Sequence, residues 1–149
     1  MPHFTLQISP QGAILNALIG LSEARQGALK AAGQAIPNLV PIRALVDTGA
    51  SATCVDPSVL QALNLSPTGN TMVVTPSTGG KPAAVDQYDV GLIVPPADRN
   101  QVPLIMTTLP VICAELLVSQ GFHALIGRDV LRQCVFSYNG SIGLFTLAY

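Results

Sequence analysis

Short apolar segments separated by turn-forming residues run through the whole chain, and this succession restricts its fold more than any other feature. The 149 residues include 13 glycines and 12 prolines, which end the segments. Several segments alternate apolar and polar residues, as a strand with one buried face does. The strands expected on this basis are Phe4–Ser9, Ala13–Leu21, Pro41–Val46, Thr53–Val55, Thr71–Thr75, Ala84–Val94, Val102–Thr108, Val111–Ala114, Ala124–Ile126, Cys134–Tyr138 and Ser141–Leu147. The sequence therefore predicts one mostly-β domain over residues 1–149, barrel-like or sandwich-like, with one or two short helices.

Helical signals are few and local. Asp56 suits an N-cap and Pro57 suits the first helical position, so a short helix is expected in the stretch that follows. The segment "RDVLRQ", which begins at Arg128, could form another. The small, polar stretch 22–38 is expected to be a long connection with at most a helical turn from Ser22. Asn139-Gly140 predicts a hairpin between the last two strands.

Charge and hydropathy limit the partners of the chain. Charged residues make up 10% of the sequence, the net charge is -1, and no basic or acidic run occurs. We therefore expect neither nucleic acid nor a membrane as a partner. Hydrophobic residues make up 49% of the sequence, which indicates either surface buried in an oligomer or sparing solubility. No span of about 18 apolar residues and no secretory signal are recognisable, so a cytoplasmic location is expected.

The residue types that bind metals or form disulfides are sparse. Cys54, Cys113 and Cys134 form neither an even framework nor a C-x-x-C pair, which is typical of reduced, mostly buried thiols. His3 and His123 have no acidic cluster beside them. We therefore expect no metal and no cofactor.

The stretch "ALVDTGASATCV" places Asp47 directly after three apolar residues. Asp47-Thr48-Gly49 is compatible with an ordinary turn. However, the apolar residues place the carboxylate at the end of a buried strand, where it is costly unless it is hydrogen-bonded or partly protonated. The small residues that follow allow another backbone to come close. About 80 residues later, "ALIGRDVL" repeats an apolar run, a glycine, a polar pair and a helix.

These two motifs at this distance resemble the retropepsin-like, or retroviral-type, aspartic proteases, especially the non-viral members that are free-standing single domains. The resemblance extends from about residue 41 to residue 131. It implies the acid-protease barrel and a flap in the hairpin at about 71–94. It also implies that backbone groups of Ser77, Thr78, Gly79 and Gly80 grip the substrate.

The resemblance implies an aspartic endopeptidase, and such an enzyme needs two carboxylates side by side. This chain contains one Asp-Thr-Gly, so we expect a two-fold homodimer in which the two Asp47 side chains share a proton and activate a water. The substrate would be a peptide or a protein. The alternative is a catalytically weak or inactive module of the same fold, which dimerises or binds peptides with its groove covered by residues 22–38.

The resemblance also gives roles to the neighbours of Asp47. Thr48 is expected to reach across the dimer, and Gly49 to let the substrate backbone approach. Ala50 stands where two-lobed relatives often have a serine that donates to the carboxylate. Because such a donor favours the charged form, its absence predicts activity at milder acidity.

Gly127, Arg128 and Asp129 are expected to support the site and the dimer. In the viral members, the counterpart of Arg128 pairs with an acid soon after the catalytic triplet. That acid is missing here, which leaves Asp56, Asp129 or backbone carbonyls as partners of Arg128. Asp129 is interpreted as an early helical residue whose charge suits the helix dipole, and not as a second catalytic acid.

Overall fold

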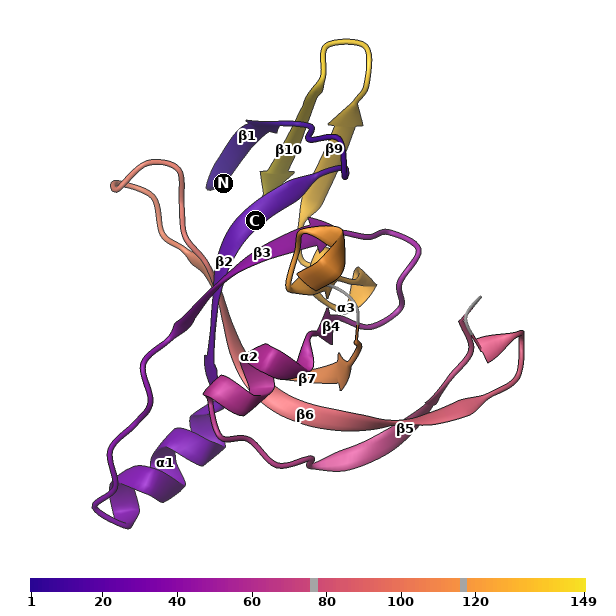
Figure 1. Ribbon diagram of the computed structural model, residues 1–149. Helices are drawn as coiled ribbons and strands as arrows, with labels where there is room; N and C mark the ends of the chain where they lie inside the picture. The colour runs from indigo at the N-terminus through magenta and orange to yellow at the C-terminus, as the bar shows by residue number, and fades with distance from the viewer. Residues whose placement is uncertain (76–77, 116–117) are drawn as a thin grey trace.

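The computed structural model covers residues 1–149 and describes all of them except 76–77 and 116–117. Strands dominate, and the predicted mostly-β fold is confirmed (Figure 1). In chain order the elements are β1 (His3–Gln7), β2 (Ile14–Leu21), α1 (Glu23–Ala31), β3 (Val40–Val46), β4 (Cys54–Val55), α2 (Pro57–Ala62), β5 (Gly69–Val73), β6 (Ala83–Val94), β7 (Leu104–Cys113), η2 (Val118–Gln120), β8 (Ala124–Ile126), α3 (Arg128–Leu131), β9 (Val135–Asn139) and β10 (Leu144–Ala148).

The centre of the molecule is a closed barrel. Its strands follow the order β2-β3-β8-β4-β7-β6, and β6 pairs again with β2. The β3–β8 and β4–β7 pairs are parallel, and the other pairs are antiparallel. Closure removes the two unpaired edges that an open sheet would leave, so the barrel is a rigid support for the loops at its ends.

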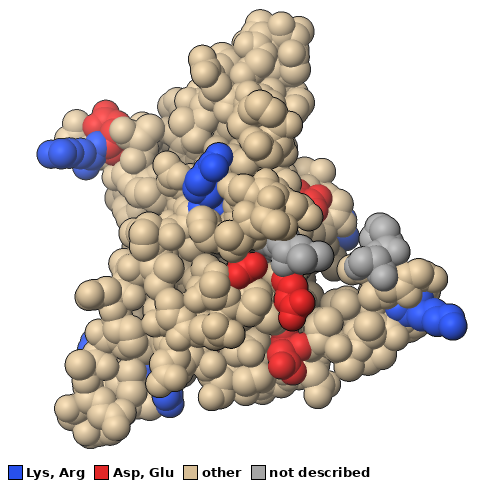
Figure 2. All heavy atoms as spheres, in the orientation of Figure 1, with Lys and Arg blue, Asp and Glu red and all other residues tan. Residues whose placement is uncertain are grey.

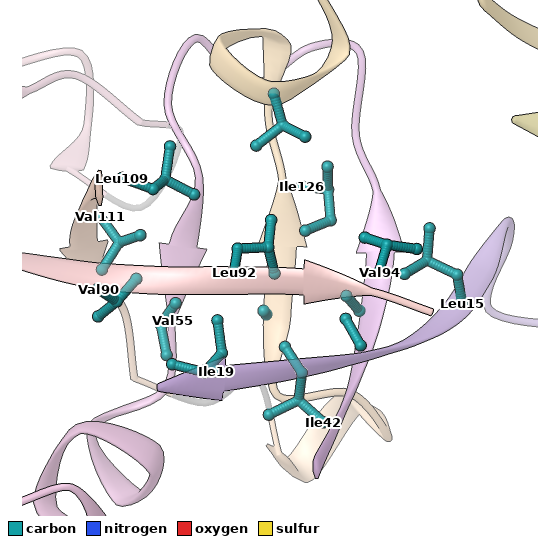
Figure 3. Close-up of a cluster of buried hydrophobic side chains, with 14 of the residues drawn as sticks. Leu15, Ile19, Ile42, Val55, Val90, Leu92, Val94, Leu109, Val111 and Ile126 are labelled. Atoms are coloured by element: carbon teal, nitrogen blue, oxygen red, sulfur yellow. The ribbon is translucent and has the colours of Figure 1, made fainter. Parts of the chain in front are cut away.

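Alternate apolar residues fill the barrel. Val90, Leu92 and Val94 on β6 are each at most 1% exposed, and Figure 3 shows them among inward-pointing side chains of β2, β3, β4, β7 and β8. Each buried side chain of this size contributes about 1.5–3 kcal/mol of transfer free energy. This core fixes the ends of β3 and β8, from which the site is built.

The hairpin of β5 and the first half of β6 leaves the barrel and extends away from it (Figure 1). The two strands pair from Gly69 opposite Gln87 to Val73 opposite Ala83, which confirms the predicted hairpin. In the turn, Gly79 and Gly80 have φ values of 62° and 77°, a region that glycine enters without strain. Ser77 lies outside the described residues.

A second sheet, in the order β1-β10-β9, joins the two ends of the chain. The predicted hairpin at Asn139-Gly140 is confirmed as β9 and β10. Phe4, Phe145 and Leu147 from this sheet are buried, while the β9–β10 turn protrudes from the molecule (Figure 1).

The helices are short, but α1 is longer than the sequence indicated. The expectation of a mere helical turn after Ser22 was wrong, because nine residues form a helix. The Ser22 hydroxyl accepts a hydrogen bond from the backbone N–H of Arg25 at 3.4 Å and caps this helix. The predicted helix after Asp56 is confirmed as α2, and the Asp56 carboxylate accepts from the N–H of Ser58 at 2.9 Å. Among the described residues, no helix has the length and apolar character needed to cross a membrane.

The prediction of two separate strands at Val102–Thr108 and Val111–Ala114 was wrong. The chain forms one continuous strand, β7, which runs through Pro110. Pro110 pairs with Asp89 of β6, while on the other side of β7 the short strand β4 reaches only Ile112 and Cys113. A proline, which lacks an N–H, is tolerated in a strand where that side has no strand partner.

Candidate active site

Asp47 follows the last residue of β3. Its backbone N–H donates to the carbonyl of Ile126 at 3.0 Å, which continues the parallel pairing of β3 with β8 by one bond. Ala44 and Val46 point into the core and are buried. The barrel therefore fixes the point from which the half-buried Asp47 side chain leaves the strand.

The residues after Asp47 form a tight loop around its carboxylate. The N–H of Gly49 donates to Asp47 Oδ1 at 2.8 Å, and the N–H of Ala50 donates to the Asp47 carbonyl at 3.3 Å. A Cβ atom at Gly49 would lie only 3.1 Å from Asp47 Oδ1, so glycine allows this close approach. Thr48 and Gly49 are exposed, which leaves the outer side of the loop open.

Arg128 holds this loop through backbone carbonyls, one of the three possibilities that the sequence left open. Its Nη1 donates to the carbonyls of Thr48 at 3.1 Å and Gly49 at 3.2 Å. Its backbone N–H donates to the carbonyl of Ala50 at 3.0 Å. The guanidinium thus donates hydrogen bonds to backbone carbonyls that the turn itself leaves without a donor.

Asp129 has a structural partner that sequence reasoning missed, the fully buried Thr53. The carboxylate of Asp129 accepts from the backbone N–H and the hydroxyl of Thr53, both at 2.8 Å. Thr53 Oγ1 in turn accepts from the N–H of Gly127 at 3.1 Å. Asp129 is an early helical residue, as expected, and it also accepts from the N–H of Val130 at 2.9 Å.

Gly127 permits the close contact between these two segments. A Cβ atom there would lie 2.6 Å from the carbonyl carbon of Ala52 and 2.7 Å from its oxygen. Real Cβ contacts are not this short, so only glycine fits without movement of the backbone. The structure thus brings together Asp47, Thr48, Gly49, Ala50, Gly127, Arg128 and Asp129 at one end of the barrel.

A cleft of about 1000 Å³ opens beside Asp47 and extends along the inner side of the β5–β6 hairpin. Its described lining includes Asp47, Gly49, Ala50, Ser51, Ala52, Cys54, residues 71–75, Gln87, Met106, Thr108, Leu109, Pro110, Ile112, Gln120, Leu125, Asp129 and Arg132. Every second residue of β7 from Met106 to Ile112 contributes to one wall. The same alternation is present in the sequence, but Pro110 was interpreted as a break between two strands, so this wall was not predicted.

Two segments that were expected beside the cleft are not part of its described lining in the single chain, and the substrate-binding role of the hairpin turn stays a prediction. Residues 71–75 of the hairpin line the cleft, whereas Thr78, Gly79 and Gly80 do not belong to the described lining of this single chain. Instead, the Thr78 hydroxyl donates to the carbonyl of Thr75 at 2.8 Å and stabilises the turn. No residue of the described segment 22–38 lines the cleft, since α1 packs beside a different groove. Among the described residues, no group of three or more His, Cys, Asp or Glu side chains could hold a metal ion.

The model of the aspartyl protease family matches residues 33–130, about two thirds of the chain. The chain belongs to the aspartyl protease family. The matched region contains β3, the Asp47 loop, the β5–β6 hairpin and the start of α3.

Its fold is that of the retropepsin-like aspartyl proteases. The crystal structure of a retropepsin-like aspartic protease from Rickettsia conorii superposes with a TM-score of 0.59. The match covers 99% of this chain and 90% of that chain at 15% sequence identity, so it establishes the fold alone. No curated protein is significantly similar in sequence.

Cys54 lies in the cleft of this member of the aspartyl protease family but is a poor nucleophile. Burial raises the pKa of its thiol to about 11, and the nearby Asp129 and Asp47 carboxylates add to the increase. Because alkylation requires the thiolate, we expect iodoacetamide to modify Cys54 at pH 8 about 100-fold more slowly than a cysteine of ordinary pKa. Peptide mass spectrometry across a pH series measures this rate. Modification at pH 8 as fast as that of a cysteine in a short peptide would contradict it.

The Thr53 hydroxyl should contribute more to stability than its size suggests. Thr53→Val leaves the N–H of Gly127 and one acceptor site of Asp129 without a partner. We expect a loss of about 2–3 kcal/mol in the free energy of unfolding, measured by urea denaturation. Thr53→Ser keeps the hydroxyl and is the matched control, with an expected loss of about 1 kcal/mol or less. Equal losses in the two variants would show that the hydroxyl has no special role.

Proposed function

We propose that the protein is an aspartic endopeptidase whose catalytic pair consists of Asp47 from each of two copies of the chain. The observation that carries the proposal is the position of Asp47, which lies in the wall of a peptide-sized cleft at the end of a barrel strand. The chain has one Asp-Thr-Gly, so one copy supplies half of the carboxylates that the chemistry requires. Membership of the aspartyl protease family supports this function.

The reaction follows from two close carboxylates that cannot both ionise. One proton is shared by the pair, which titrates as a unit. The ionised member removes a proton from a water, and the water oxygen attacks the carbonyl carbon of the scissile peptide bond. The protonated member donates to the carbonyl oxygen. Collapse of the tetrahedral intermediate breaks the C–N bond, and the amine leaves with a proton from the pair.

The rest of the Asp47 loop has supporting roles in this proposal. Thr48 is exposed in the single chain and reaches the backbone of the second copy. Gly49 leaves room for the substrate backbone, and Gly127, Arg128 and Asp129 keep the loop in place. Preorganised groups of this kind lower the cost of orienting the water and the substrate.

The substrate is an extended peptide with apolar side chains. Met106, Pro110 and Ile112 form an apolar stretch of the cleft wall, and Met72 and Val74 on the opposite hairpin are each 62% exposed. An extended peptide can pair with the strands that border the cleft, as in β-strand addition. The β5–β6 hairpin then acts as a flap that covers the peptide and excludes water.

A peptide-library cleavage assay combined with a measurement of molecular mass tests this function. We expect cleavage between apolar residues at mildly acidic pH by a dimer, and inhibition by a statine-type compound that imitates the tetrahedral intermediate. A confirmed dimer that leaves the library uncut from about pH 3 to pH 8 would instead favour a peptide-binding or dimerisation module.

Ala50→Ser tests the expected acidity of the reaction. A hydroxyl at this position can donate to the Asp47 carboxylate and favour its ionised form, so the working pH range should move downward. We expect the pH optimum of kcat/KM to fall by about 0.5–1 unit. Ala52→Ser, in the same small-residue stretch of the cleft wall, is the control. An unchanged or higher optimum for Ala50→Ser would count against this role.

A further inference from the structure

Arg132 is the one cationic side chain in the described lining of the cleft. The charged residues of that lining are Asp47, Asp129 and Arg132. Charge is scarce in this chain, which has 7 lysines and arginines in 149 residues, and Figure 2 shows that most of the visible face carries no charged side chain. In a largely apolar pocket, a charged side chain is typically a group that orients and selects the ligand.

The guanidinium of Arg132 has no partner within the described parts of the chain. It forms neither an ion pair nor a side-chain hydrogen bond there, and the residue is exposed. Arg128, one helical turn earlier, differs, because its Nη1 donates to the carbonyls of Thr48 at 3.1 Å and Gly49 at 3.2 Å. One of these two arginines is therefore part of the structure, and the other is available to a ligand.

Asp129 does not neutralise Arg132, because its carboxylate is already engaged. It accepts from the N–H and the hydroxyl of Thr53, both at 2.8 Å, and from the N–H of Val130 at 2.9 Å. The positive charge of Arg132 therefore remains for a carboxylate from outside the chain. A guanidinium suits this partner, since it can donate two parallel hydrogen bonds to the two oxygens of one carboxylate.

Helix α3 separates Arg132 from the Asp47 loop. Arg132 caps the C-terminal end of this helix, and its N–H donates to the carbonyl of Arg128 at 3.0 Å. The two arginines are thus one turn apart, about 6 Å along the helix axis. Each residue of an extended peptide covers about 3.3 Å. We therefore place the partner of Arg132 about two or more residues away from the scissile bond.

We propose that Arg132 binds an acidic side chain of the substrate, so that the enzyme selects apolar cleavage sites flanked by aspartate or glutamate. This inference rests on the proposed function and deepens it. The apolar cleft wall selects the residues at the scissile bond, whereas Arg132 selects residues farther along the peptide. Two copies related by a two-fold axis place one Arg132 toward each end of the shared cleft. The preferred peptide therefore carries an acidic residue on both sides of the bond.

A series of peptides tests this specificity. Each peptide has two apolar residues at the scissile bond and glutamate, glutamine or lysine at one position about two to four residues from it. We expect kcat/KM for the best-placed glutamate to exceed that for glutamine, which has the same shape without the charge, by about tenfold. Glutamate on both sides should give about 100-fold, because the two arginines act independently. The difference should lie in KM, since the contact is the same in the ground state and the transition state.

Three substitutions of Arg132 separate its charge from its shape. Arg132→Met should abolish the preference for glutamate, and Arg132→Lys should keep part of it, because an ammonium group keeps the charge but not the two parallel hydrogen bonds. Arg132→Glu should reverse the preference, so that lysine is selected over glutamate. A merely structural role of Arg132 would not produce this reversal. The matched control is Arg99→Met, since Arg99 is exposed in the loop between β6 and β7, outside the described cleft lining, and its loss should leave the preference unchanged.

Several results would overturn the role of Arg132 while leaving the catalytic role of Asp47 intact. One is equal kcat/KM of the wild type for the glutamate and glutamine peptides, and another is an undiminished preference in Arg132→Met. A third is loss of the dimer in Arg132→Met, measured by sedimentation, since Arg132 would then meet a carboxylate of the second copy and not of the substrate.

Binding of the same peptides gives a readout that does not depend on catalysis. Fluorescein-labelled peptides are titrated with wild-type protein and with Arg132→Met, and binding is measured by fluorescence anisotropy. A wild-type protein that cleaves no peptide but binds the glutamate peptide about tenfold more tightly than the glutamine peptide, with the difference lost in Arg132→Met, would support the carboxylate site and contradict the proposed function. Equal binding of the two peptides, or no binding of either, would overturn the carboxylate site.

Discussion

We expect Asp47→Asn to lower kcat/KM for a cleaved peptide by about 10³-fold or more while the protein remains folded and dimeric. The amide is nearly the same size as the carboxylate and can still accept the hydrogen bond from Gly49. However, it can neither take a proton from water nor share one with its counterpart. Because every copy carries the substitution, both members of the pair are lost at once. Peptide cleavage measured beside sedimentation gives the two quantities together.

Asp98→Asn is the matched control for this experiment. Asp98 is exposed in the loop between β6 and β7, where its carboxylate accepts a hydrogen bond from the N–H of Asn100 at 2.9 Å. Its replacement changes the net charge by the same amount and should leave kcat/KM unchanged. Activity of Asp47→Asn within tenfold of the wild type would remove Asp47 from the mechanism.

The second large effect concerns Gly127. Gly127→Ala introduces a methyl group within 2.6 Å of the Ala52 backbone, which forces apart the two segments that support the Asp47 loop. We expect a loss of about 3–4 kcal/mol in the free energy of unfolding, at the severe end of single substitutions. Activity should fall as well, since displacement of the Thr53 and Asp129 contacts changes the position of the loop. Urea denaturation measures the stability.

Gly27→Ala is the control, and its expected effect has the opposite sign. A Cβ atom at Gly27, inside α1, would meet nothing within 4 Å. Alanine is the better helix former, so this variant should be more stable by about 0.5–1 kcal/mol. Destabilisation of both variants by similar amounts would show that the clash at Ala52 is not the cause of the loss in Gly127→Ala.

Local signals in the sequence were sufficient to predict the features that depend on neighbouring residues. Asp56 and Pro57 predicted α2, and Asn139-Gly140 predicted the last hairpin. The two motifs around Asp47 and Gly127 predicted the fold. In each case the deciding interaction spans a few residues, or the motif is specific enough to identify the fold.

Contacts between distant segments could not be read in the same way. Thr53 and Asp129 are 76 residues apart, and their hydrogen bonds exist only because β8 lies between β3 and β4 in the barrel. Likewise, nothing local in β2 indicates that it pairs with both β3 and β6 and closes the barrel. Pro110 was misjudged for a related reason, since a proline is excluded from a strand only where a neighbour needs its N–H.

Mixed dimers of wild-type protein and Asp47→Asn test the central claim most directly, which is that two chains build one active site. After exchange of subunits, the activity of a mixture at constant total protein should follow the square of the wild-type fraction, because only dimers with two carboxylates cleave. An equal mixture should therefore retain about a quarter of the wild-type activity. Activity in direct proportion to the wild-type fraction, about a half in the equal mixture, would mean that each chain works alone and would contradict the account.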